Sequence, residues 1–336
     1  MIKHPIISKG RAYPLLFLLL LVLFSAGCGQ KAPEPELTRL TIAFPEWVGY
    51  GLFYLAKEKG FFREEGIELV FINERLDSAR RDAFKQGMLD CEATTLDMLV
   101  TKAVQDTPIA AVMEIDHSFG SDGIAAAENI KQLNDLINKK VALSRDDTGE
   151  ILISYLFQKN GLSLTNVIIV PTRPEEAAKA FLDGKADACV TWEPHLSQAL
   201  QRPGAHILTS SREHPDIIVD TLNVRKDLIE HDPGLVKRLM RGWFKALKFY
   251  REKPNEAGEI IAKYYKITPE QYGKQVAGLK WIDYEHQKTP AKYKEWVEVF
   301  NTVTEIKSAN GRIPQKPEAQ KFLNHSLLEK LYEAGQ

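Results

Sequence analysis

Apolar and polar positions along the chain predict strands and helices in turn. A short apolar run predicts a strand, a stretch with helical periodicity predicts a helix, and a second apolar run predicts another strand. This order occurs twice, at residues 40–44, 51–59 and 66–71 and again at residues 141–143, 149–160 and 166–170. A further apolar run at residues 108–113 closes the first unit. We therefore predict two tandem β-α-β-α-β units.

An eight-residue motif marks the same place in both units. Residues 83–90 read A-F-x-x-G-x-x-D, and residues 180–187 repeat the pattern. The glycine of each copy follows a predicted helix, so we expect Gly87 and Gly184 to adopt positive φ. Strands that alternate with helices predict parallel sheets with helices on their faces. Because ligands bind outside the carboxyl ends of such strands, two facing sheets predict a ligand cleft.

The last third of the chain has a helical pattern. Between residues 232 and 250, an apolar stripe contains Leu235, Leu239, Trp243, Leu247 and Tyr250. Further helices are predicted to about residue 331, and they carry no chemical motif. We expect these helices to pack against the first unit.

Composition and charge narrow the class of protein. The 336 residues are enough for two domains, each with its own core. Lys and Arg number 44 against 45 Asp and Glu, which favours neither nucleic acid nor an acidic membrane surface as a partner. The eight histidines are scattered, so we expect no metal site, no cofactor and no catalytic site. Cys91 and Cys189 fall in separate predicted sheets, so we expect two buried free thiols.

The N-terminus has the pattern of a secretory signal. Three basic residues precede an apolar run at residues 15–24, and small residues follow. Cys28 directly after Ala-Gly resembles a bacterial lipoprotein signal, although Ser25 stands where that signal usually has Leu. The resemblance implies that residues 1–27 are removed and that Cys28 carries a lipid; a plain cleaved signal peptide is the alternative. Residues 28–37 are predicted to form a proline-containing tether.

Several stretches of the chain resemble one protein family. Residues 47–67 begin Trp-Val-Gly-Tyr and continue to Gly-Phe-Phe-Arg-Glu-Glu-Gly-Ile, which is similar to the start of substrate-binding proteins of the nitrate, taurine and alkanesulfonate type. These proteins are components of bacterial ABC importers, and thiamine-precursor-binding proteins are related to them. The other stretches with this resemblance are residues 132–142, 180–194 and 220–228.

The resemblance implies an α/β fold of the periplasmic-binding-protein type II-like kind. Two α/β lobes with central sheets would enclose the cleft, and two crossovers would join them. Residues 116–124, which are small and polar, are predicted to form the first crossover as a hinge loop. Residues 217–228 are predicted to cross back. The first lobe would comprise residues 38–117 and 222–336, and the second lobe residues 118–221.

We expect the ligand to contact residues around this cleft and in the crossovers. The candidates are Trp47, Tyr50, Thr94, Thr95, Asp116, Ser118, Asp147, Thr148, Gly149, Trp192, Glu193 and Asp220.

The candidates leave the charge of the ligand open. Free N–H groups at Gly149 and at Thr94-Thr95 can hold an anion, but Asp147 and Thr148 are also ordinary helix caps. Aspartates beside the pocket disfavour an anion. The resemblance implies oxyanion ligands, whereas the local charge favours an amine or a neutral ring.

Other side chains also allow two interpretations. A Trp after a buried strand favours a ligand platform over core packing, which applies to Trp47 and Trp192. Glu193 either accepts a hydrogen bond from the ligand or caps the helix that Pro194 begins. His117 and His195 fall on predicted cleft loops, where they are either solvated or ligand contacts.

Together these features predict an extracytoplasmic solute-binding lipoprotein of an ABC importer. It would be a monomer, anchored to the membrane through Cys28 in the periplasm or at the cell surface, that delivers a small polar solute of the nitrate, taurine or sulfonate class to the permease transmembrane subunits. A binding protein for a thiamine-precursor pyrimidine or another nitrogenous heterocycle is one alternative, and a ligand-sensing ectodomain is another. An enzyme is not expected.

Overall fold

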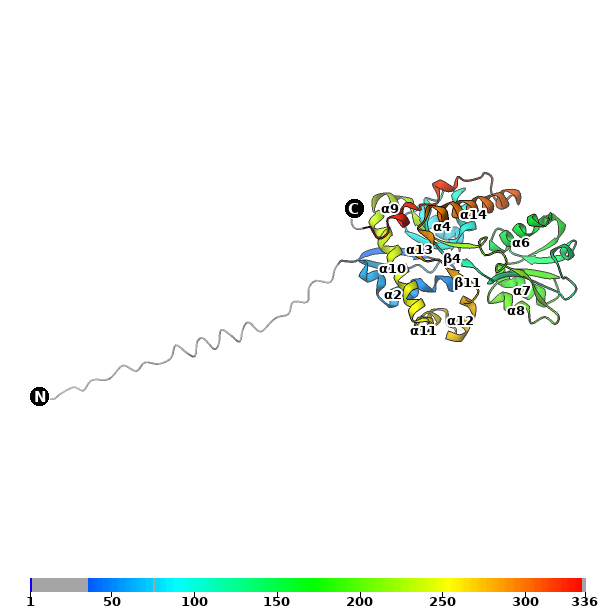
Figure 1. Ribbon diagram of the computed structural model, residues 1–336, viewed down its shortest axis with the longest axis horizontal. Helices are drawn as coiled ribbons and strands as arrows, with labels where there is room; N and C mark the ends of the chain where they lie inside the picture. Colours follow the sequence, from blue (N-terminus) through cyan, green and yellow to red (C-terminus); the bar gives the residue numbers. More distant parts are fainter. Residues whose placement is uncertain (2–35, 75, 334–336) are drawn as a thin grey trace. The chain divides into compact units, whose positions relative to one another are not determined.

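The computed structural model describes residues 1, 36–74 and 76–333 (Figure 1). Residues 2–27 of the predicted leader, the lipidation residue Cys28 and all but the last two residues of the tether lie outside the described residues. All elements discussed below belong to the compact unit that begins at Leu37. Among the described residues, no helix is both long enough and apolar enough to cross a membrane.

The first sheet has six strands, in the order β11-β4-β10-β3-β1-β2. Strand β1 pairs in parallel with β2 and β3, whereas β10 pairs antiparallel with β3 and β4. The bounds of the strands are β1 Thr38–Ala43, β2 Ile67–Phe71, β3 Cys91–Thr95, β4 Ile109–Ser118, β10 Val219–Arg225 and β11 Leu279–Trp281.

The second sheet has five strands, in the order β7-β6-β8-β5-β9. Strand β6 pairs in parallel with β7 and β8, whereas β5 pairs antiparallel with β8 and β9. The bounds of the strands are β5 Asp122–Ala126, β6 Lys140–Leu143, β7 Ile168–Pro171, β8 Ala188–Trp192 and β9 His206–Ser210.

The helices follow the strands in the predicted alternation. In chain order they are α2 Gly51–Glu58, α3 Phe61–Glu64, α4 Asp77–Lys85, α5 Leu96–Ala103, α6 Thr148–Lys159, α7 Pro174–Leu182, α8 His195–Ala199, α9 Lys226–His231, α10 Pro233–Glu252, α11 Pro254–Tyr265, α12 Pro269–Val276, α13 Tyr284–Gln287, α14 Pro290–Ala309 and α15 Ser326–Glu329. Short 3-10 helices lie at η1 Val48–Tyr50, η2 Leu133–Leu136, η3 Leu164–Asn166 and η4 Ala319–Lys321.

The predicted parallel sheets are correct within each tandem unit and wrong for the sheets as a whole. The strands that pass between the sheets insert antiparallel: β10 lies between β3 and β4, and β5 lies between β8 and β9. The neighbours of these two strands therefore come from distant parts of the sequence, as does the neighbour of β11, which pairs antiparallel with β4. These pairings depend on tertiary packing, which local periodicity does not report.

The first crossover is a pair of strands rather than the predicted hinge loop. Strand β4 continues through Ser118 and β5 begins at Asp122, so only residues 119–121 connect them. Strand pairing explains the difference, because the Ser118 N–H donates to the Ile218 carbonyl and His117 pairs with Val219. The predicted lobe boundaries at residues 117/118 and 221/222 fall within β4 and β10, and they stay predictions.

The repeated motif has the same structural role in both units. Phe84 and Phe181 are buried, and Gly87 and Gly184 have φ of 69° and 71°, which confirms the predicted conformation. The final aspartate of each copy accepts a hydrogen bond from the backbone of the first strand of its unit. Thr41 N donates to Asp90 Oδ2 and Lys140 N to Asp187 Oδ2, at 2.9 and 2.8 Å.

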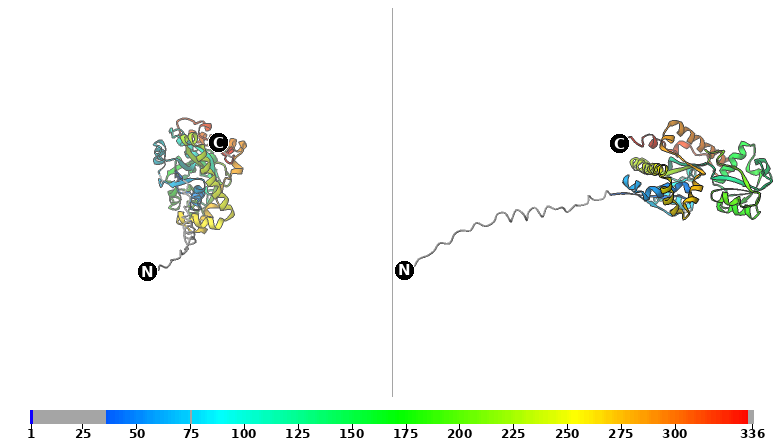
Figure 2. Two further views of the ribbon diagram at one scale, coloured as in Figure 1. Left: turned by 90° about the vertical axis from the view of Figure 1, so that its left-hand side faces the viewer. Right: turned by 60° about the horizontal axis from the view of Figure 1, so that its bottom comes forward.

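Helices cover both faces of the second sheet (Figures 1 and 2). Side chains alternate between the faces of a strand. Val141 and Leu143 of β6 therefore pack with α6, whereas Ala142 packs with the alanines of α7. Cys91 and Cys189 are buried and free, as predicted, one in each sheet.

Helix α14 packs against the first unit, as expected for the C-terminal helices, and also contacts the second unit. The helix contacts α5 and α6. Its apolar stripe belongs to the same core cluster as residues from both helices; the stripe consists of Trp296, Phe300, Val303 and Ile306. The apolar stripe of α10 packs against the first unit as predicted: it contacts α2 and α3 and belongs to the core cluster that includes residues of the first sheet.

Candidate functional site

A cavity of about 400 Å³ lies between the ends of strands from both sheets. From the first sheet it receives Thr94 and Thr95 at the end of β3 and Asp220 in β10. From the second sheet it receives Asp122 at the start of β5 and Trp192 at the end of β8. This volume is within the usual range for small-molecule sites, which is roughly 300–1,000 Å³.

The structure brings eight of the twelve predicted site residues to this cavity. They are Trp47, Tyr50, Thr94, Thr95, Asp147, Thr148, Trp192 and Asp220. A second cavity of about 520 Å³ shares Trp47 and Trp192 with the first. The two indole rings therefore lie where both cavities meet.

The other four predicted residues do not line the cavity. Asp116 and Ser118 are fully buried in β4. The N–H of Gly149 donates to Asp147 Oδ1 at 3.0 Å, so Asp147 caps α6. Glu193 accepts hydrogen bonds from the Ser197 backbone and hydroxyl at 3.2 and 2.8 Å, and it thus holds α8. Glu193 lines only the second cavity.

Asp116 and Ser118 support residues that do line the cavity. Asp116 Oδ1 accepts from Trp47 Nε1 at 3.3 Å, and a side chain at Gly49 would overlap the Asp116 carboxylate. The Ser118 hydroxyl accepts from the Asp122 N–H at 3.2 Å. These contacts position an aromatic wall and an acidic residue of the site.

Sequence reasoning missed several wall residues. They are Pro45, Glu46, Asp77, Arg80, Met98, Asp122, Pro174 and Ile218. Asp122 lay inside the segment that we expected to be a loop. A signal was present, because residues 122–126 are apolar after the aspartate and Asp122 pairs with Trp192 in the sheet.

Four carboxyl groups lie at or behind the cavity wall; those of Asp116, Asp122 and Asp220 are buried and that of Asp147 is partly buried. Burial raises the pKa of Asp116, Asp122 and Asp147 to about 7. Burial also raises the pKa of Asp220 well above its usual value, and the nearby Asp116 carboxylate adds to this effect. Among the described residues, no lysine, arginine or histidine forms an ion pair with any of the four.

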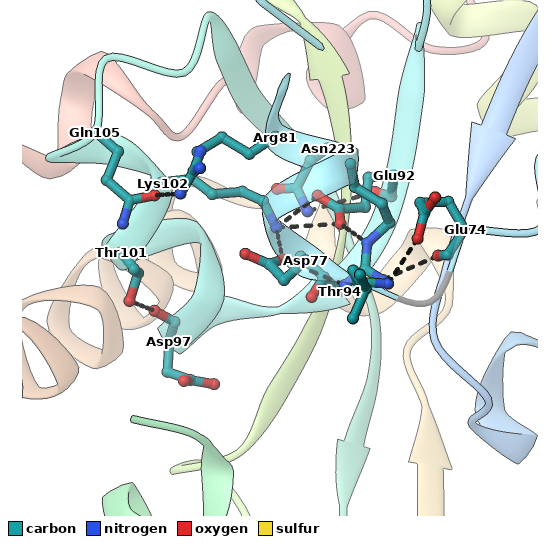
Figure 3. A network of polar contacts seen from close by, with 12 residues as sticks. Glu74, Asp77, Arg81, Glu92, Thr94, Asp97, Thr101, Lys102, Gln105 and Asn223 are labelled. Atoms are coloured by element: carbon teal, nitrogen blue, oxygen red, sulfur yellow. Dashed lines mark hydrogen bonds and ion pairs between the residues drawn. The ribbon is translucent and has the colours of Figure 1, made fainter. Parts of the chain in front are cut away.

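A different arrangement surrounds Glu92, in β3 behind the cavity (Figure 3). Arg80 Nε donates to Glu92 Oε1 at 2.6 Å, and Lys102 Nζ lies 3.0 Å from Glu92 Oε2. Asp77 forms ion pairs with both cations. Arg80 and Asp77 line the cavity, so the cation on its wall is already neutralised by carboxylates of the protein.

The aromatic residues of the wall are held by hydrogen bonds. The Tyr50 hydroxyl donates to Asp220 Oδ1, and the Tyr265 hydroxyl donates to the Trp47 carbonyl at 2.5 Å. Trp192 is partly exposed and belongs to none of the three apolar core clusters. It is the last residue of β8 rather than a loop residue.

Neither predicted histidine lines this cavity. His117 forms ion pairs with Glu114 and Asp216 at 3.3 and 3.4 Å, and these carboxylates raise its pKa to about 9 although burial opposes the change. His195 lines the second cavity and contacts Gln198. In the part of the chain that the structure describes, no cluster of three or more histidine, cysteine or acidic residues could hold a metal ion.

Similar proteins provide an independent test of the fold. Residues 48–257 match the profile of the family described as NMT1/THI5 like. A protein of Bacillus subtilis (strain 168), whose name assigns it to aliphatic sulfonate binding, is 27% identical over 268 residues, or 74% of this chain and 77% of the relative. The periplasmic aliphatic sulphonate binding protein SsuA from Escherichia coli superposes with a TM-score of 0.72 at 18% identity, covering 87% of this chain and 92% of that one.

An enzyme has the same fold. The desulfurization enzyme DSZB superposes with a TM-score of 0.60 at 14% identity, covering 87% of this chain and 99% of that one. The predicted α/β fold of periplasmic binding proteins and the predicted relationship to sulfonate-type binding proteins are confirmed. The fold alone does not separate binding from catalysis, so the function must be argued from the site.

Proposed function

The chain belongs to the NMT1/THI5-like family, and from that premise we propose that it is the extracytoplasmic solute-binding lipoprotein of an ABC importer. It acts as a monomer, binds one small polar solute between its two lobes and delivers that solute to the permease transmembrane subunits. The lipid on Cys28 keeps it at the membrane, in the periplasm or at the cell surface.

One observation carries this proposal: the wall of the cavity comes from both sheets. Strands β3 and β10 contribute Thr94, Thr95 and Asp220, and strands β5 and β8 contribute Asp122 and Trp192. A solute that contacts both groups stabilises the arrangement in which they lie close together. Such binding can shift a hinged protein toward a closed state that the permease distinguishes from the open one.

The resemblance to DSZB makes an enzyme the competing class, and the site supports a binding protein instead. The described cysteines, Cys91 and Cys189, are buried in strands and do not line the cavity. Burial also raises the pKa of both thiols, which disfavours the nucleophilic thiolate. The aspartates of the cavity have no histidine or lysine partner among the described residues that could form a nucleophile pair.

Mass spectrometry of small molecules that co-purify with the protein tests the binding function. We expect one solute to be released on denaturation and to rebind the stripped protein in calorimetry at a one-to-one ratio. Incubation with the protein should return that solute unchanged. A chemically altered product would contradict the binding function and favour the enzyme.

Membrane anchoring has a separate test in Cys28→Ala. Only a thiol at this position can be acylated, so the variant should move from the membrane fraction to the soluble fraction when it is expressed in a bacterium. Binding of the co-purified solute should not change. A variant that stays in the membrane fraction would contradict the lipid anchor and leave the binding function intact.

A further inference from the structure

The cavity presents carboxylates that have no cation of the protein beside them. Asp122 and Asp220 are only 4% and 2% exposed, and both line the cavity together with Asp147. Among the described residues none of the three forms an ion pair. A buried carboxylate without a compensating charge is unfavourable, so the site requires either protons or a cation from outside.

Other buried carboxylates near the cavity do have a cation of the protein beside them. Three other buried carboxylates in the same part of the molecule are paired: Glu92 with Arg80 and Lys102, Asp97 with Lys307, and Glu150 with Arg312. The one wall cation among the described residues, Arg80, faces Glu92 and Asp77. The fold therefore supplies cations to buried carboxylates nearby, but among the described residues it supplies none to Asp122, Asp147 and Asp220 or to Asp116 behind them.

The aromatic side chains of the wall are also suited to a cationic ligand. Trp47, Tyr50 and Trp192 line the cavity. The indole of Trp47 is held by Asp116, whose second carboxylate oxygen is buried without a hydrogen-bond partner among the described residues. Aromatic faces attract organic cations, and this attraction strengthens when the site excludes water.

We propose that the solute is a small organic cation with N–H donors, such as a protonated amine. Its charged nitrogen lies among Asp122, Asp147 and Asp220, and its carbon skeleton lies against Trp47 and Trp192. This inference rests on the proposed solute-binding function and adds the charge of the solute. The size of the cavity and the absence of a metal-ligand cluster in the described ranges favour an organic cation over a metal ion.

The proposal sets this chain apart from relatives that are named for sulfonates. A sulfonate would place a negative charge beside carboxylates that already lack counter-charges, and such repulsion is a common means of rejecting a wrong ligand. The N-terminus of α6 offers no compensation at Gly149, because that N–H group is bound to Asp147.

The test uses protein stripped of solute by unfolding and refolding. A bacterial metabolite extract is divided on ion-exchange resins into cationic, neutral and anionic fractions, and each fraction is added to the protein in a thermal-shift assay at pH 7.5. Butylammonium and butanesulfonate, which share a carbon skeleton, serve as single-compound probes at millimolar concentration. We expect the cationic fraction to raise the melting temperature, and butylammonium to do so more than butanesulfonate.

Two variants connect the shift to the cavity. Asp122→Asn and Asp147→Asn keep the shape of the side chain and should weaken binding of the active cationic compound at least about tenfold, since each removes a charge-assisted hydrogen bond. Asp147→Asn also retains a residue type that caps helices. Asp146→Asn is the matched control, because Asp146 is adjacent but pairs with Lys307 outside the cavity wall, and it should bind as the wild type does.

The possible results separate this inference from the proposed function. A shift with the anionic or the neutral fraction alone would overturn the cationic assignment and leave solute binding intact. A cationic shift that survives both cavity substitutions would also overturn it. A shift with no fraction at all would contradict solute binding itself.

Discussion

Two groups of buried or partly buried carboxylates lie within one part of this protein, and they differ in their partners. Glu92, Asp97 and Glu150 each contact a lysine or arginine of the chain. Asp122, Asp147 and Asp220 face the cavity without such a contact among the described residues. We call the first set the paired carboxylates and the second set the cavity carboxylates.

The difference indicates that the paired carboxylates stabilise the fold and that the cavity carboxylates are available to bind a ligand. A paired carboxylate is neutralised by a cation of the protein even when no solute is bound, so removal of its charge leaves that cation without this partner. A cavity carboxylate has no cation of the protein beside it when no solute is bound. Removal of its charge therefore removes the unfavourable free energy of a desolvated, unpaired charge. The same substitution should therefore have opposite effects on stability in the two groups.

Glu92→Gln should produce the largest effect on stability. Glu92 and Lys102 are both 0% exposed, and the substitution removes the carboxylate that Lys102 and Arg80 both contact. Figure 3 shows Glu92 beside Lys102 and Asp77. Breaking a buried pair costs roughly 3–5 kcal/mol. Urea unfolding should show a loss of this size with an unchanged m-value.

Asp122→Asn is the matched control for Glu92→Gln, because it also exchanges a buried carboxylate for an amide. In solute-free protein at pH 8 it should leave the free energy of unfolding unchanged or raise it. Equal losses in the two variants would show that the distinction between paired and cavity carboxylates is wrong.

The sequence predicts the tandem units well because their signals are local. The repeated motif fixes a buried phenylalanine, a glycine of positive φ and an aspartate that bonds to the neighbouring strand. The antiparallel insertion of β10 could not be predicted in this way. Its partners, β3 and β4, are more than 100 residues away in the chain, and no periodicity records such a pairing.

In the site, too, residues with a local sequence signal were predicted, and residues placed by tertiary packing were not. Trp47 and Trp192 were predicted because they follow recognisable strands, and Tyr50 because it belongs to a stretch that resembles the family. Asp122 was missed because a loop does not fix which of its side chains face the cleft, whereas the pairing of β5 with β8 does. The paired carboxylates were not predicted at all. Whether Glu92 meets Lys102 depends on how β3 and α5 pack, and the sequence alone offers only two residues of opposite charge ten positions apart.

Trp192→Ala should have an intermediate effect, and it acts on the cavity side of the comparison. An aromatic contact contributes about 1 kcal/mol beyond the area it buries, so affinity for the co-purified solute should fall at least about tenfold. The melting temperature of the empty protein should change little, because Trp192 lies outside the apolar core clusters. Calorimetry and thermal unfolding of one preparation measure both. A large fall in melting temperature would identify Trp192 as a core residue, and an unchanged affinity would remove it from the site.

The smallest expected effect is a difference in melting temperature between substitutions at two adjacent aspartates that precede α6. Asp146 Oδ1 lies 2.7 Å from Lys307 Nζ, whereas Asp147 lines the cavity. Asp146 has φ of 61°, and Asp147 caps the helix through the Gly149 N–H. Asparagine accepts both positions, so Asp→Asn at either one changes the charge and keeps the backbone.

At pH 8 we expect the two substitutions to change the melting temperature in opposite directions. Burial raises the pKa of Asp147 to about 7, although the Ser144 hydroxyl and the N–H groups of Gly149 and Glu150 oppose this, and Asp97 adds to it. Folding therefore favours the neutral form, whose stabilising contribution is complete below about pH 4 and is lost as the pH rises through about 7. At pH 8, Asp147→Asn should raise the melting temperature of solute-free protein, and the gain should shrink as the pH falls to 5. Asp146→Asn should instead lower it at pH 8 by the equivalent of about 1 kcal/mol or less, since the Asp146 side chain is partly exposed. Thermal unfolding of the two variants and the wild type at pH 5, 6.5 and 8 measures the contrast, and shifts of the same sign at pH 8 would contradict it.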